Sequence, residues 1–180
     1  MCSSHDHDHT HSRRRFLTLT SGMLLSTTFP SLVYANAPSM DLPRPGPRDV
    51  CPVCGMFVAK YPDWVATVLF HDGHADHFDG AKDFFKYLFD LQKYVPGRKR
   101  SDIVGMGVTD YYDVKLIDAR RALYVVGSDV YGPMGHEFIP HPNAADANEF
   151  NRDHKGDGIV TFSDVTQALA FNLDKGVFKD

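Results

Sequence analysis

Residues 51–56 read Cys-Pro-Val-Cys-Gly-Met and place two thiols and one thioether within six residues. Soft sulfur ligands select Cu(I), zinc or iron–sulfur clusters over hard cations such as Mg²⁺ and Ca²⁺. The same two thiols, Cys51 and Cys54, could instead carry redox chemistry. The segment therefore predicts either a soft-metal site or a thiol–disulfide site.

The chain around this segment favours a metal over disulfide exchange. A thioredoxin-like Cys-x-x-Cys is expected to open a helix after a strand. Here a proline-rich stretch precedes the cysteines, and residues 57–60 are too short for that helix before Tyr61-Pro62. An exported thiol–disulfide oxidoreductase that uses Cys51 and Cys54 to maintain copper-site thiols stays as the alternative function. A single inert disulfide is the purely structural alternative.

Three histidines offer a zinc site as another alternative. Zinc needs four nitrogen or sulfur ligands, and His71, His74 and His77 could complete Cys51 and Cys54. Their spacing does not match the familiar zinc-finger pattern, and they lie in a polar turn rich in aspartate. The pattern therefore favours solvated turn residues over zinc ligands.

Methionines could complete a Cu(I) site, because thioether sulfur is a soft ligand. Met56 directly follows a glycine, where the backbone can turn tightly. Met134 lies in the Gly-Pro-Met-Gly loop of residues 132–135, and loops of this kind lie at the surface rather than in the core. Met106, between two glycines, is a weaker candidate on the same argument, and Met40 is weaker again.

The first 37 residues have the character of an export signal. Arginines occupy positions 13–15, an apolar stretch follows at about residues 17–32, and Ala-Asn-Ala stands at 35–37. This order is typical of a removable signal peptide, and arginines followed by Phe-Leu resemble a bacterial twin-arginine signal. No cysteine lies near the expected cleavage site, so no lipid anchor is evident. Retention of the segment as a membrane anchor is the other possibility.

The rest of the chain fits one domain after a linker. Residues 38–48 contain four prolines and predict an extended linker, and residues 49–180 have the size of one ordinary domain. The net charge of the whole chain is −4, which argues against a nucleic-acid partner. Two cysteines after residue 37 are too few for a disulfide scaffold.

The hydrophobic pattern predicts an α+β domain with mostly antiparallel strands. Strands and helices alternate with short connections, and strand–strand–helix order occurs in both halves. Asp79 and Asp164 are expected to cap helices. The expected strands are residues 64–70, 104–109, 114–117, 122–126 and 159–162, and the expected helices are residues 79–94, 145–154 and 164–173.

Several motifs in this order resemble the NosL family, the copper-binding accessory proteins of nitrous oxide reductase. The resemblance covers nearly the whole of residues 49–180 and includes residues 51–56. The further motifs are Trp64, Phe78-Asp79, Tyr111-Tyr112, Ile117-Asp118-Ala119-Arg120, Tyr-Val-Val-Gly-Ser-Asp at residues 124–129, and Gly132-Pro133-Met134-Gly135.

The resemblance implies a single compact domain of two strand–strand–helix halves, similar to domains of organomercury lyase. It implies a periplasmic Cu(I) metallochaperone, not an enzyme, that supplies the copper–sulfur site of nitrous oxide reductase. The implied partners are the nitrous oxide reductase apoprotein and a membrane ABC-type maturation complex. Many family members look like lipoproteins, whereas the signal of this chain favours a soluble periplasmic protein.

The resemblance also implies the copper ligands. Cys54, Met56 and Met134 would bind Cu(I) and leave an open position for water or a donor group. Cys51 could be a further ligand, a thiol that exchanges copper with Cys54, or its disulfide partner.

Overall fold

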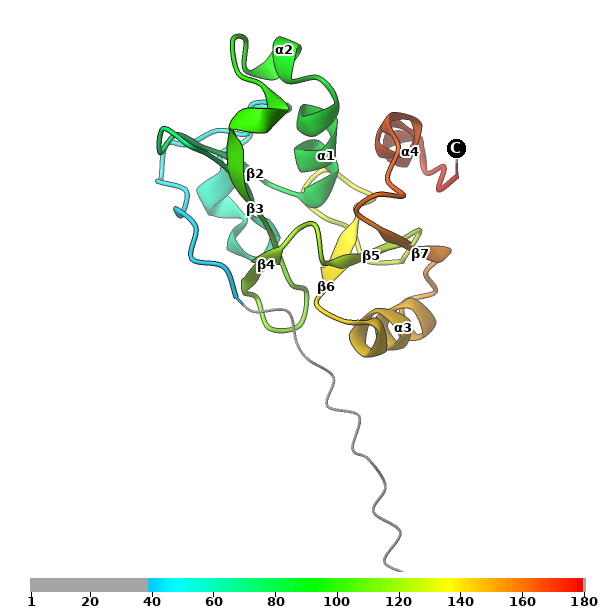
Figure 1. Ribbon diagram of the computed structural model, residues 1–180. Coiled ribbons are helices and arrows are strands. Elements are labelled where there is room, and N and C mark those ends of the chain that lie inside the picture. The colour runs from blue at the N-terminus through cyan, green and yellow to red at the C-terminus, as the bar shows by residue number, and fades with distance from the viewer. Residues whose placement is uncertain (1–38, 180) are drawn as a thin grey trace, which may run out of the picture. The chain divides into compact units, whose positions relative to one another are not determined.

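The computed structural model describes residues 39–179, which form two antiparallel sheets with helices packed beside them (Figure 1). This mixture of strands and helices confirms the predicted α+β class. The predicted signal peptide, residues 1–37, lies outside the described residues. Within residues 39–179, no helix is long and apolar enough to cross a membrane.

The first sheet has the strand order β2-β1-β3-β4. Its inner strands are β1 (Ala66–Phe70) and β3 (Ile103–Thr109), and its outer strands are β2 (Ala75–Phe78) and β4 (Leu116–Asp118). The inner strands are buried along most of their length, which explains their nearly continuous apolar sequences. A turn at Gly73, with φ +87°, joins β1 to β2.

The second sheet has the order β6-β5-β7, with β5 (Leu123–Val126) in the centre. Its edges are β6 (Ile139–His141) and β7 (Gly158–Thr161), and helix α3 (Ala144–Asp153) packs against all of its strands. Pro140 has no N–H to donate, so it is compatible with an edge strand such as β6.

Helix α1 (Ala81–Phe89) packs against the first sheet and against α4 (Gln167–Asn172) (Figure 1). The single helix predicted for residues 79–94 is wrong, because the chain breaks at Asp90. The Asp90 carboxylate accepts from the Lys93 N–H, and Asp90 is the N-cap of a separate helix, α2. α2 spans Leu91–Tyr94, and the short 3₁₀ turns are Val58–Lys60, Pro62–Trp64, Arg100–Asp102 and Leu173–Lys175.

An aromatic cluster joins the two halves around Phe85 of α1. Its ring centroid lies 5.1 Å from that of Tyr124 in β5 and 5.0 Å from that of Phe138 before β6. Phe162, just after β7, lies 5.4 Å away. Aromatic contacts at these distances hold α1 against the second sheet as well as the first.

The sequence did not predict two strands and misassigned two caps. β2 mixes Asp and His with apolar residues, and β6 contains a proline, so neither has the usual strand signature. Thr166 caps α4, while Asp164 instead accepts from Thr161. The predicted cap of α1 by Asp79 is also wrong, because the N-cap position is Gly80.

Part of the predicted linker contacts the first sheet. Ser39 forms an antiparallel bridge with Ile117 of β4, and the side chain of Leu42 is buried. The methyl groups of Leu42 occupy the space above two glycines of β3, where a Cβ would lie 2.8 Å (Gly105) and 2.7 Å (Gly107) from them. Residues 39 and 42, within the predicted linker, are therefore already part of the folded contacts.

His141 of β6 is fully buried, and neither of its ring nitrogens has a hydrogen-bond partner within residues 39–179. The rings of Tyr112 and Phe150 lie 5.5 Å and 4.8 Å from its ring. Burial, and to a lesser degree the charge of His154, lowers the pKa of His141 to about 4 from 6.5.

We expect His141 to make the fold less stable in acid. Between its unfolded pKa near 6.5 and its folded pKa near 4, the unfolded chain binds the proton first, so stability falls as pH falls. The loss is on the order of 3 kcal/mol. In urea unfolding measured at pH 7 and pH 4.5, the His141→Phe variant should lack this loss of unfolding free energy. His71→Phe, at an exposed position, is the control that should keep it. An unchanged pH dependence in His141→Phe would contradict this account.

Candidate metal centre

Residues 51–56 form a closed loop that holds both thiols. The Gly55 N–H donates to the Cys51 carbonyl, and the Cys51 N–H donates to the Met56 carbonyl, both at 2.8 Å. Gly55 has φ +79°, a left-handed conformation that glycine adopts without steric cost. The residues that flank the loop pair in an antiparallel bridge, which fixes its two ends.

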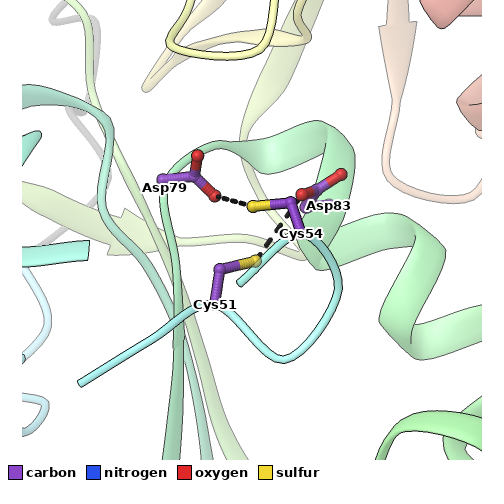
Figure 2. Close-up of side chains that lie close together, drawn as sticks. All are labelled: Cys51, Cys54, Asp79 and Asp83. Atoms are coloured by element: carbon purple, nitrogen blue, oxygen red, sulfur yellow. Dashed lines mark hydrogen bonds between the residues drawn. The ribbon is translucent and has the colours of Figure 1, made fainter. Parts of the chain in front are cut away.

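Two carboxylates face these thiols from the start of α1 (Figure 2). The Cys54 thiol donates to Asp79 Oδ1 at 3.2 Å, and the Cys51 thiol donates to Asp83 Oδ2 at 3.5 Å. Asp79 stands between β2 and α1, and Asp83 lies in the first turn of α1. One ligand atom from each of the four residues lies within 4.8 Å of the others.

The centre is largely buried, with Cys54 as its more open side. Cys51 and Asp79 are each 1% exposed and Asp83 is 4% exposed, whereas Cys54 is half-buried. Asp79 Oδ2 has no hydrogen-bond partner among the described residues. A buried carboxylate oxygen normally has one, so this oxygen is available to a further donor or a cation.

Both cysteines are free thiols. Burial raises the pKa of Cys54 to about 12, and its hydrogen bonds to Asp79 and Asp83 act in the same direction. Burial also raises the pKa of Cys51 well above its usual range, with Asp83 adding to the effect. Reactive redox cysteines have lowered thiol pKa values, so this environment disfavours thiol–disulfide exchange.

The donor set fits a soft metal ion. The two sulfur atoms are ligands that Cu(I) and zinc both accept, and the two carboxylates also suit zinc. The three histidines considered as zinc ligands are not part of this group. His71 and His74 are exposed, as expected for turn residues, whereas His77 is buried in β2 and bonds with Thr67. The zinc site that combined these histidines with the cysteines is therefore wrong.

The methionines occupy different environments. Met56 ends the cysteine loop and is half-buried. Met134 is 46% exposed, and its carbonyl accepts from Lys82 Nζ at 2.8 Å, so its loop lies against α1. Met106 is 2% exposed within β3, where it is a core residue. Met134 thus belongs to the loop beside α1, the helix that carries Asp83, whereas Met106 does not.

Asp79 and Asp83 were not predicted as members of the site. The sequence context of Asp79 predicts a helix cap, since an acid before an apolar helix usually has that role. Their four-residue spacing would place both acids on one helix face only if both were helical, whereas α1 begins at Ala81. Nothing in the local sequence shows that this face meets residues 51–56.

Comparison with known proteins gives a consistent result. A protein-family model named NosL matches residues 44–170. A solved structure, the copper chaperone NosL from Shewanella denitrificans, is 25% identical, with a TM-score of 0.59. The match covers 73% of this chain and 99% of that one. The search of curated proteins found no match.

We expect Asp79→Asn to make Cys54 more reactive. The variant replaces the charged carboxylate that raises the pKa of Cys54 with a neutral amide, which raises it less, so more thiolate forms at a given pH. Each pKa unit lost raises the thiolate fraction tenfold and lowers its nucleophilicity about threefold, for a net gain of about threefold. Iodoacetamide labelling of Cys54, followed by peptide mass spectrometry, measures this. Asp113→Asn, at an exposed ion pair with Lys115, is the control. A slower or equal rate in Asp79→Asn would contradict the geometry.

Proposed function

We propose a function that starts from the family: this chain belongs to the NosL family, and it acts as a periplasmic Cu(I) metallochaperone. The observation that carries the proposal is the convergence of Cys51, Cys54, Asp79 and Asp83 within 4.8 Å. The similar Shewanella denitrificans protein is a copper chaperone, and a buried thiol pair open on one side suits the same role.

The proposed copper ligands are Cys54, Met56 and Met134, and Cys51 is a further candidate. Thiolate and thioether sulfur favour Cu(I). The hard carboxylates suit a different task, because each already accepts the hydrogen of one thiol. When copper replaces a thiol proton, the neighbouring carboxylate can accept that proton. Copper binding is therefore coupled to release of the thiol proton.

Half-buried Cys54 and exposed Met134 suit copper transfer. Incoming ligands from a partner can reach this side of the centre while buried Cys51 retains its contact with Asp83. Copper would then pass by exchange of one ligand at a time. The proposed recipient is nitrous oxide reductase, for its copper–sulfur site, through a membrane ABC-type maturation complex. The proposed location is the periplasm, reached by the twin-arginine-like signal.

The alternative, a thiol–disulfide oxidoreductase, receives less support. Residues 51–56 lead into a short 3₁₀ turn, Val58–Lys60, rather than opening a helix. The raised pKa of Cys54 would also leave little thiolate for exchange at neutral pH. Catalytic turnover of a mixed disulfide at Cys54 would favour the alternative instead.

We expect tight one-to-one Cu(I) binding by the reduced protein in competition with a Cu(I) chelator. Cys54→Ser and Met134→Ala should each weaken binding at least about tenfold, or 1.4 kcal/mol, because each removes a sulfur ligand. Met106→Leu is the matched methionine control, since Met106 lies in the core of β3. Binding that neither Cys54→Ser nor Met134→Ala weakens would overturn the ligand assignment.

The client requires a separate experiment. In a strain that lacks this protein, nitrous oxide reductase should accumulate without its copper–sulfur site, as judged by metal content and absorption spectrum. Complementation with wild-type protein should restore the site, and Cys54→Ser should not. Full maturation in the deletion strain would exclude the proposed client.

A further inference from the structure

The loop that carries Met134 is attached to α1 by two contacts from one residue, Lys82. The Lys82 ammonium donates to the Met134 carbonyl at 2.8 Å, and the Lys82 backbone N–H donates to the Glu137 carboxylate. Lys82 is only 1% exposed. Burial of a lysine is costly unless its charge is paired, so these contacts and its ion pair are what keep it inside.

Glu137 acts as a remote cap for α1. Its side chain is buried, and Oε1 accepts from the Lys82 N–H and from its own neighbour, the Phe138 N–H at 3.0 Å. Gly80, the N-cap residue, has no side chain to cap the helix, and a Cβ there would overlap the Glu137 carboxylate. The helix start and the segment after Met134 are therefore fitted to each other.

An ion-pair network continues from this contact to the metal centre. Asp174 accepts from Lys82 at 3.0 Å through Oδ1 and from Lys86 at 2.8 Å through Oδ2. Lys86 also lies 3.4 Å from Asp83, which accepts from the Cys51 thiol. Residues 82, 83 and 86 share one face of α1, and Asp79 stands just before the N-cap Gly80. The start of α1 therefore brings together the carboxylates of the centre and the lysines that fix the surrounding segments.

We propose that Lys82 is a positioning residue for copper binding, which holds the Met134 loop where its thioether completes the Cys54 site. The inference rests on the proposed role of Met134 as a ligand. It assigns a task to a buried cation that touches neither thiol. Met134 itself is half-exposed on a surface loop, so its place depends on backbone contacts of this kind rather than on packing of its side chain.

A double-mutant cycle tests the proposal. Lys82→Met should weaken Cu(I) binding by a factor close to that of Met134→Ala, roughly tenfold. The double variant should bind no more weakly than Met134→Ala alone, because both changes remove the same ligand. X-ray absorption of the copper-loaded protein should show one sulfur ligand fewer in Lys82→Met. Effects that multiply in the double variant, or an unchanged sulfur count, would overturn the proposal.

Two further variants keep the test decisive. Lys86→Met loses the same Asp174 partner but makes no bond to Met134, so it should retain the wild-type sulfur count. If Lys82→Met does not fold, Asp174→Asn, at a half-exposed position, should shift binding in the same direction by a smaller factor. Suppose that Met134→Ala binds copper weakly but Lys82→Met binds it normally. That result would overturn the role of Lys82 and leave the proposed function intact. If Lys82→Met does not fold, normal binding by Asp174→Asn would have the same meaning. Normal binding by Cys54→Ser and Met134→Ala would sink the proposed function too.

Discussion

A carboxylate from a distant segment caps α1, and this leaves Asp79 free to face the Cys54 thiol. The first N–H groups of any helix need acceptors, and an aspartate just before a helix normally supplies one. Here Glu137 accepts from the Lys82 N–H, while Asp79 accepts from Cys54. If Asp79 capped its own helix, the centre would lose a carboxylate. The same contact places the segment beyond Met134 against α1, so the helix start sets the geometry on both sides of the centre.

Around the centre, aspartate carboxylates are paired with thiols and lysine ammonium groups in a largely buried region. Asp83 lies between the Cys51 thiol and Lys86, and Asp174 lies between the two lysines of α1. Electrostatic interactions are strong where water is excluded, and an unpaired charge there is costly. Asp79 Oδ2, which has no hydrogen-bond partner within residues 39–179, is the exception. It belongs to the carboxylate whose other oxygen accepts from the Cys54 thiol.

The sequence was sufficient for the class of the fold and for placing a candidate metal-binding segment at residues 51–56, because both follow from local patterns. Apolar runs identified β1, β3 and β5, and adjacent sulfur residues indicated a soft metal. What it could not supply were contacts between distant segments. Asp79 has the sequence context of a cap, and only the position of Glu137 shows that the cap comes from elsewhere. Asp83 and Lys82 look like ordinary helix-surface residues, yet both are buried. The predicted signal peptide, linker boundary and organomercury lyase similarity stay predictions.

The attachment of residues 39–42 to the first sheet has a consequence for the solubility of the domain. β4 is an outer strand, and Ser39 and the Met40 N–H occupy part of its free edge. Leu42 covers the two glycines of β3, which have no side chains of their own to shield the backbone. An unpaired strand edge is a template for pairing with another chain. A chain shortened to residue 49 would expose that edge together with an apolar slot, and would favour edge-to-edge self-association over the monomer, although every residue of the metal centre would still be present.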